Sequence, residues 1–149
     1  DFFPLLQRFK VRRLGALKAA GDDLAQHVAA DAVATTLAVA AASALPIMCF
    51  VGNRGIVQIY SGPIRALERQ DGHLRIADPD FRLELDTTRI GSAWVVNKPT
   101  TDGWVTSLEV YDVAGELIVQ FFGVRKPGQP ELPAWRALMN RLCATPLAS

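Results

Sequence analysis

The chain has 149 residues, of which 50% are apolar, and its formal net charge is +1. This length suits one domain and is enough to bury a hydrophobic core. The low charge and scattered basic residues argue against nucleic-acid binding and against a polybasic membrane anchor. The longest apolar run, residues 37–51, is interrupted by Ser43 and Pro46. It is shorter than the roughly 20 residues that span a bilayer, so membrane insertion is not expected.

The first part of the chain is predicted to be helical and then extended. Residues 2–9 carry apolar side chains at helical spacing, and residues 13–20 continue as a second short helix that ends at Gly21. Residues 22–28, which include His27, are interpreted as an edge strand.

A helix followed by a buried strand is expected next. Asp31 is a plausible N-cap for a helix that runs to about Ala44, with alanines and leucines on its buried side. Pro46 ends this pattern because proline cannot continue a helix, and residues 47–51 form a strand. Cys49 in that strand is interpreted as a small buried hydrophobe. The other cysteine lies far away in sequence and no disulfide is required, so a reducing cytoplasm is the expected compartment.

The rest of the chain predicts an antiparallel sheet followed by a helix. Turn residues separate runs that are typical of short strands. The expected strands are residues 56–61, 64–68, 73–77, 81–86, 91–97, 105–111 and 117–124. Residues 133–142 form an amphipathic helix whose apolar stripe includes Trp135 and Met139. The predicted fold class is therefore α+β: a large antiparallel β-sheet with flanking helices, in a single domain over residues 1–149.

Common catalytic and metal-binding motifs are not found in the sequence. There is no nucleophile elbow, phosphate-binding P-loop, dinucleotide fingerprint or zinc-ligand spacing. Asp78 and Asp80 flank a proline, a pattern more typical of a turn than of a metal site or an acid–base pair. Gln120 lies in a strongly apolar strand, so its side chain needs a polar partner.

Four sequence blocks are similar to one known family. They are DFFPLLQRF at the start, PIMCFVGNRGIVQIYSGPI in the middle, ADPDFRLEL, and the long block from Trp94 to Leu142. Together they resemble the C-terminal half of the cytoplasmic haem-binding proteins of the HemS/HmuS type, in the HemS/ChuX superfamily. The resemblance implies one repeat of the HemS-like fold, as the second half of a duplicated protein that binds haem between elements of both halves. In single-half relatives, two copies pair as a homodimer.

The resemblance also implies which residues contact haem. The matching positions are Arg13, Met48, Phe50, Lys98, Gln120, Phe122 and Arg125. In this interpretation the cations face the haem propionates, since the planar arginine fork pairs with a carboxylate and lysine acts as a point charge. Met48 and Phe50 form the apolar wall, and Phe122 falls where some family members have tyrosine. Without the resemblance, Arg13 and Lys98 are more typical of solvated surface residues, and Met48 and Phe50 of a hydrophobic core.

The position of Arg125 near the end of a strand decides which face of the sheet its side chain reaches. On a regular strand, Gln120 and Phe122 share one face, whereas Arg125 projects to the other. A bulge near Gly123 is expected to bring Arg125 back to the same side.

The haem iron ligand is expected outside the sequence. The family's axial histidine immediately precedes the Xaa-Phe-Phe of the first helix, and here that Xaa is Asp1. The resemblance therefore places the histidine immediately upstream of Asp1. The chain's own donors are weaker candidates because none has that position: His27, His73, Tyr60, Tyr111 and Cys49.

The resemblance implies haem (hemin) binding and trafficking in the cytoplasm, during bacterial haem uptake and iron acquisition. Two alternatives stay open: one half of a haem-degrading enzyme, and a structural or dimerisation domain that binds no haem alone. An enzyme would need to add only a distal pocket and an electron donor, because haem itself activates oxygen. The expected partners are haem, the N-terminal half of the same protein or a second copy, and a haem oxygenase as acceptor.

Overall fold

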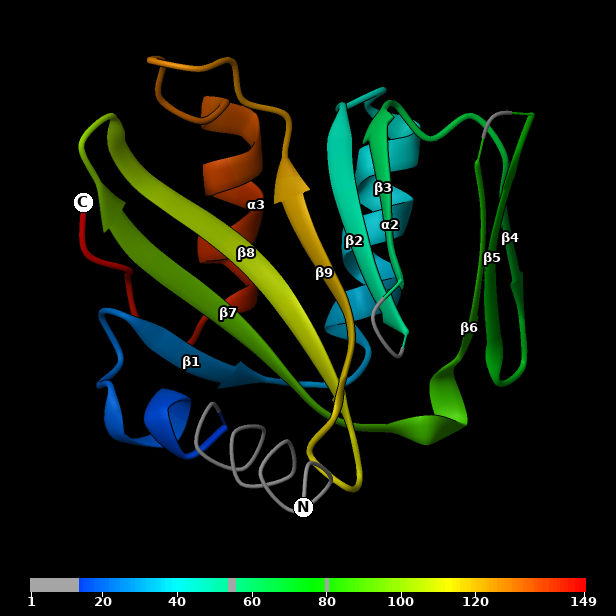
Figure 1. Ribbon diagram of the computed structural model, residues 1–149, viewed down its shortest axis with the longest axis horizontal. Coiled ribbons are helices and arrows are strands. Elements are labelled where there is room, and N and C mark those ends of the chain that lie inside the picture. The colour runs from blue at the N-terminus through cyan, green and yellow to red at the C-terminus, as the bar shows by residue number, and fades with distance from the viewer. Residues whose placement is uncertain (1–13, 54–55, 80) are drawn as a thin grey trace.

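The computed structural model describes residues 14–53, 56–79 and 81–149, with the side chains of residues 52–60 and 81 excepted. The helix predicted at residues 2–9 and the candidate Arg13 therefore lie outside the described residues. Within these ranges the strands form a six-stranded sheet and a three-stranded sheet, called here the large and the small sheet (Figure 1). The α+β class with a large antiparallel sheet is confirmed. Nothing in the sequence pattern indicated that residues 67–86 form a sheet of their own.

The large sheet is antiparallel throughout and joins segments that are distant in sequence. Its strands, in spatial order, are β1 (Ala25–Val28), β7 (Ile90–Thr100), β8 (Gly103–Asp112), β9 (Leu117–Gly123), β2 (Ile47–Asn53) and β3 (Ile56–Gly62). β1 is an edge strand, as predicted. The pairing of β2 with β9 places Met48 opposite Phe122 and Phe50 opposite Gln120.

The small sheet contains β4 (Leu67–Gln70), β5 (His73–Asp78) and β6 (Phe81–Asp86), and the short 3-10 helix η1 (Thr87–Arg89) connects it to β7. The buried Asp78 carboxylate accepts hydrogen bonds from the backbone N–H groups of Arg65 and Ala66, at 3.1 and 2.7 Å. This Asp78 therefore fixes the segment that leads into β4. Within the described ranges, no group of three or more His, Cys, Asp and Glu residues could hold a metal ion.

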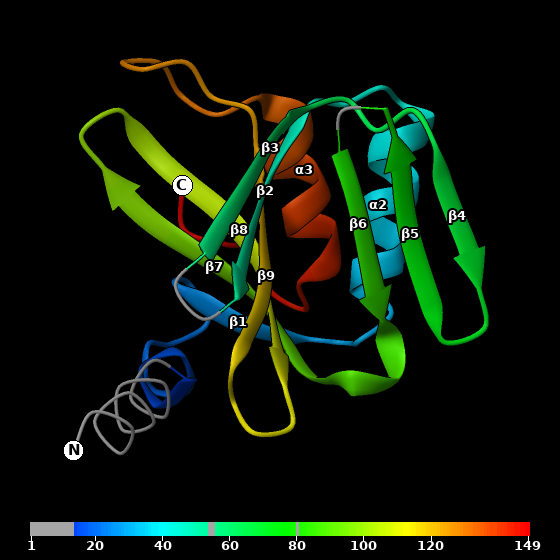
Figure 2. The same ribbon diagram turned by 45° about the vertical axis from the view of Figure 1, so that its right-hand side comes forward.

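Two helices, α2 (Ala32–Ala42) and α3 (Pro133–Leu142), complete the core. α3 packs on β8 and β9, and α2 packs against β4 (Figure 2). One hydrophobic core includes side chains of both sheets. Asp31 occupies the predicted N-cap position of α2, but its side chain makes no capping hydrogen bond. Its φ of −69° and ψ of −11° are already helical, whereas a capping residue usually has extended angles. None of the helices in the described ranges combines the length and apolar character needed to cross a membrane.

The two faces of the large sheet differ in what covers them. Residues that alternate along β2, β8 and β9 point toward the helices and are fully buried: Ile47, Cys49, Leu108, Val110, Val119 and Phe121. On the opposite face, the helical segment 14–19 packs Leu14 and Leu17 against Trp94 and Tyr111. This segment ends before Gly21, whose φ of +87° suits a glycine after a helix. The rest of that opposite face, around Met48, Phe50, Val105, Gln120 and Phe122, is only half-buried and is called the open face.

Candidate functional site

The open face carries a pocket of about 150 Å³ at its β2–β9 corner. The lining residues are Met48, Phe50, Val105, Phe122, Gly123, Arg125 and Glu131. This set includes four of the positions singled out by the sequence: Met48, Phe50, Phe122 and Arg125. The fold therefore brings residues that lie far apart in the chain into one apolar pocket with a cation on its wall.

Strand register produces the apolar part of the pocket. Cα partners in an antiparallel pair project to the same face, so Met48, opposite Phe122, shares that side with it. The rings of Phe50 and Phe122 lie 5.3 Å apart at 81°, an edge-to-face arrangement that aromatic pairs favour. All three side chains are half-buried, so they offer apolar surface to a ligand.

Arg125 reaches the pocket, but the bulge expected near Gly123 is wrong. The β2–β9 register runs without a shift to the pair Ile47–Gly123, where β9 ends. Arg125 lies beyond the strand, and therefore its side chain is released from the alternation of faces. Gly123 has a different role, because a Cβ at this position would lie 2.6 Å from Cγ of Trp135. The glycine therefore allows α3 to pack closely on β9.

The Arg125 guanidinium is held at the rim of the pocket by two acceptors. Its Nη1 lies 3.3 Å from Oδ2 of Asp102, in the turn between β7 and β8, and 3.5 Å from the Gln129 carbonyl oxygen. The Arg125 side chain is 28% exposed and that of Asp102 is 35% exposed. The cation is thus accessible from solvent and already paired with an anion.

Lys98 lies on the same side of the large sheet but does not line the pocket. It is exposed and opposite Val105 in the β7–β8 register, so its side chain projects to the open face next to a pocket residue. This position allows Lys98 to act as a second cation beside the pocket.

Gln120 has the polar partner that the sequence predicts. Its Nε2 donates a hydrogen bond of 3.0 Å to Oε2 of Glu109, and the Tyr111 hydroxyl donates one of 2.5 Å to Oε1. Both Glu109 and Tyr111 are 1% exposed. Sequence reasoning missed Glu109, although the period-two pattern Ser107, Glu109, Tyr111 in β8 placed polar groups on one face.

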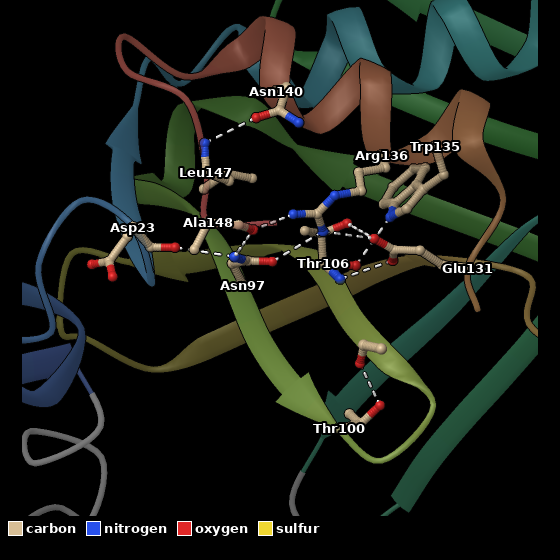
Figure 3. A network of polar contacts seen from close by, with 11 residues as sticks. Asp23, Asn97, Thr100, Thr106, Glu131, Trp135, Arg136, Asn140, Leu147 and Ala148 are labelled. Atoms are coloured by element: carbon tan, nitrogen blue, oxygen red, sulfur yellow. Dashed lines mark hydrogen bonds and ion pairs between the residues drawn. The ribbon is translucent and has the colours of Figure 1, made fainter. Parts of the chain in front are cut away.

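A second polar network surrounds the carboxylate of Glu131 (Figure 3). Glu131 lines the pocket, and its carboxylate accepts hydrogen bonds from the backbone N–H and the hydroxyl of Thr106, both at 2.8 Å. Arg136 of α3 approaches Glu131 at 3.3 Å, and Trp135 Nε1 donates to the Thr106 carbonyl at 3.0 Å. These contacts join the segment after β9, which carries Arg125, to β8 and α3. No local pattern predicted these contacts, because Thr106 lies 25 positions from Glu131 and 29 from Trp135.

Three of the chain's potential iron donors, Cys49, His27 and His73, are described by the structure and do not line the pocket. Cys49 faces the helices, and burial raises the pKa of its thiol to about 12, so it stays protonated. His27 is on edge strand β1, where its ring contacts Trp94 edge-on at 5.2 Å, and His73 begins β5 of the small sheet. No histidine between residues 14 and 149, in the parts that are described, lines the pocket. The side chain of Tyr60 lies outside the described residues.

Comparison with known proteins identifies the family. Residues 10–142 match the family model described as the "Haemin-degrading HemS.ChuX domain". The chain belongs to the HemS/ChuX family. Within this family it is 39% identical over 149 residues to the hemin transport protein HmuS of Yersinia pestis, covering 100% of this chain and 43% of HmuS.

Solved structures agree with this HemS/ChuX assignment. Holo-PhuS, a heme-binding protein from Pseudomonas aeruginosa, superposes with a TM-score of 0.87 and 45% identity, over 97% of this chain and 42% of PhuS. ChuS, described as an Escherichia coli heme oxygenase, gives a TM-score of 0.84 and 42% identity, over 87% of this chain and 40% of ChuS. The chain therefore spans less than half the length of these relatives.

Proposed function

We propose that this chain is a haem-binding module that carries hemin during haem uptake and iron acquisition. The observation that supports this function is the convergence of Met48, Phe50 and Phe122 with Arg125 in one pocket on the open face. A haem needs an apolar surface for its ring and cations for its propionates, and this corner offers both. The hemin transport and heme-binding descriptions of HmuS and PhuS agree with the proposal.

Haem would lie across the open face rather than inside an enclosed cavity. The pocket of about 150 Å³ is smaller than the roughly 300–1,000 Å³ of most ligand sites. One edge of the ring would occupy the pocket, with a propionate near Arg125 and a second cation in Lys98. The remaining ring surface would be covered by a partner: the other half of a duplicated protein, or a second copy of this chain.

The chain's own residues would hold haem without supplying the iron ligand. From the family resemblance, we propose that the axial histidine immediately precedes Asp1. Arg125 and Lys98 would pair with the propionates, and Gln120, held by its hydrogen bond to Glu109, would add a polar group to the haem site. When bound, haem supplies its iron for redox and oxygen chemistry.

A carrier and one half of a haem-degrading enzyme are distinguishable alternatives. The second is favoured by the 42% identity to ChuS, described as a heme oxygenase. Incubating the hemin complex with a reductant and catalase tests it, because catalase removes peroxide that degrades haem without enzymatic help. A Soret band that persists supports the carrier, whereas its conversion into ring-opened product supports the enzyme.

The first test of haem binding is a hemin titration followed at the Soret band. The 149-residue chain and a version extended upstream through the expected histidine are compared, each with Arg125→Gln as a variant. We expect tight, saturable binding by the extended form, weakened by Arg125→Gln. Binding by neither form would refute the haem function and favour a structural or dimerisation domain. Equal binding by both forms would move the iron ligand into the chain, with His27 and Tyr60 as the next candidates.

We further propose that the protein works in the cytoplasm, with a haem oxygenase as acceptor. Both cysteines are free thiols, Cys49 buried and Cys143 half-buried, as is usual in a reducing compartment. Cell fractionation with an antibody against the chain tests the location.

A further inference from the structure

The cation at the pocket rim is already bound by an anion of the same chain. Arg125 Nη1 makes a single contact of 3.3 Å with Oδ2 of Asp102. Asp102 lies in the turn from Thr100 to Gly103, where its backbone N–H donates to the Thr100 hydroxyl at 3.2 Å. The Thr100 hydroxyl in turn donates to the Gly103 carbonyl at 2.5 Å, so the turn that carries Asp102 is internally fixed.

This ion pair is weak enough to be exchanged. Arg125 is 28% exposed and Asp102 is 35% exposed, so water screens their attraction. The contact uses one guanidinium nitrogen, whereas a ligand carboxylate can approach the arginine fork with both oxygens, which is the stronger geometry. A carboxylate that enters the pocket would therefore compete with Asp102 for Arg125.

We propose that Asp102 is an internal competitor that sets the affinity of this site for the carboxylate groups of its ligand. The inference rests on the proposed haem function, with the haem propionates as those carboxylates. In the unliganded chain Asp102 neutralises Arg125, and on binding a propionate takes its place.

Asp102 could instead hold Arg125 in position, and the two roles predict opposite changes in ligand affinity when the Asp102 charge is removed. If Asp102 served only to hold Arg125 in position, removing its charge would loosen the guanidinium and weaken ligand binding. If it competes, removing its charge frees the guanidinium and strengthens binding. The direction of the change in hemin affinity therefore decides between the two roles.

The experiment is a hemin titration of the full chain and its Asp102→Asn variant, extended upstream through the expected histidine. Asn keeps the shape of Asp and removes the charge, and we expect roughly two- to fivefold tighter binding, the range for a partly exposed ion pair. Asp71→Asn is the matched control, because it makes the same change in the exposed turn between β4 and β5. It should leave hemin affinity unchanged.

A double variant tests whether the effect acts through Arg125. In the Arg125→Gln background, Asp102→Asn should no longer tighten hemin binding. Unchanged or weaker binding by Asp102→Asn alone, or the same tightening with Arg125→Gln, would overturn the inference while the haem function stands. Absence of hemin binding by the extended chain without substitutions would overturn the haem function and the inference with it.

Discussion

The two faces of the large sheet use neighbouring residues of the same strands for different tasks. On the helix-covered face, Cys49 and Phe121 are 0% exposed and belong to the hydrophobic core. Their neighbours Phe50 and Phe122 are half-buried and line the pocket on the open face. Side chains alternate along a strand, so adjacent positions face opposite sides. Residues on the helix-covered face should therefore affect stability, and their neighbours on the open face should affect ligand binding. Paired substitutions at such positions can test this separation.

The largest effect is expected from comparing Phe121→Ala with Phe122→Ala. Phe121→Ala removes a fully buried ring and should lower the free energy of unfolding by roughly 3–5 kcal/mol. Phe122→Ala should cost only about 1 kcal/mol but weaken hemin binding roughly two- to tenfold, the value of an aromatic contact. Urea unfolding and hemin titration measure both quantities, with Phe121→Leu as a milder variant if Phe121→Ala does not fold. Equal losses of stability at the two positions would break the distinction between the faces.

Gly123→Ala tests how closely the helix-covered face of the sheet packs against α3. Its Cβ would lie 2.6 Å from Trp135 Cγ, so the helix or the strand must shift, at a cost of roughly 1–3 kcal/mol. Thermal unfolding should show a lower melting temperature. Gly15→Ala is the control, since no atom lies within 4 Å of its added Cβ and the position is helical. That variant should be neutral or slightly stabilising, and an unchanged melting temperature for Gly123→Ala would contradict the packing argument.

Tyr111→Phe tests the buried polar group on the less covered side of the sheet. The change removes the donor to Oε1 of the buried Glu109 and should cost roughly 1–3 kcal/mol of stability. Hemin affinity should change less than twofold, because Gln120 keeps its bond to the other carboxylate oxygen. Urea unfolding and a hemin titration give the two values. A large loss of affinity with unchanged stability would place Tyr111 in the binding site itself.

The smallest effect is expected in thiol labelling, where the reaction rates of Cys49 and Cys143 report how deeply each thiol is buried. Burial raises the pKa of Cys49 to about 12 and that of Cys143 to about 11, so both are protonated at pH 8. Since the thiolate is the reactive form, labelling of Cys143 should accelerate about tenfold per pH unit as the pH rises toward 11. Cys49 should react only when the protein unfolds. Mass spectrometry of the labelled native protein checks this, and rapid labelling of Cys49 at pH 8 would show that the helix-covered face opens readily.

Several features of the fold were predictable because they depend on local pattern. Helix α3 has the predicted limits, Pro133–Leu142, since its apolar residues repeat at helical spacing after a proline that suits a first turn. The shared face of Gln120 and Phe122 followed from alternation along one strand. The assignment of Met48 and Phe50 to a pocket wall rested on resemblance to the family, because alternation alone does not distinguish a core from a pocket.

The sequence by itself determined the α+β class, most strands and helices, and the family, although the strand predicted at residues 64–68 is β4 at Leu67–Gln70. Tertiary structure decided which strands became neighbours, how Arg125 reached the pocket, and which anion it meets there. In the sequence, β8 and β9 lie between Asp102 and Arg125. The two side chains meet because these strands pair and the chain leaves the sheet after Gly123. The physical reason is that side-chain periodicity is a local property, whereas the position of a charge beyond a strand end depends on contacts between distant segments.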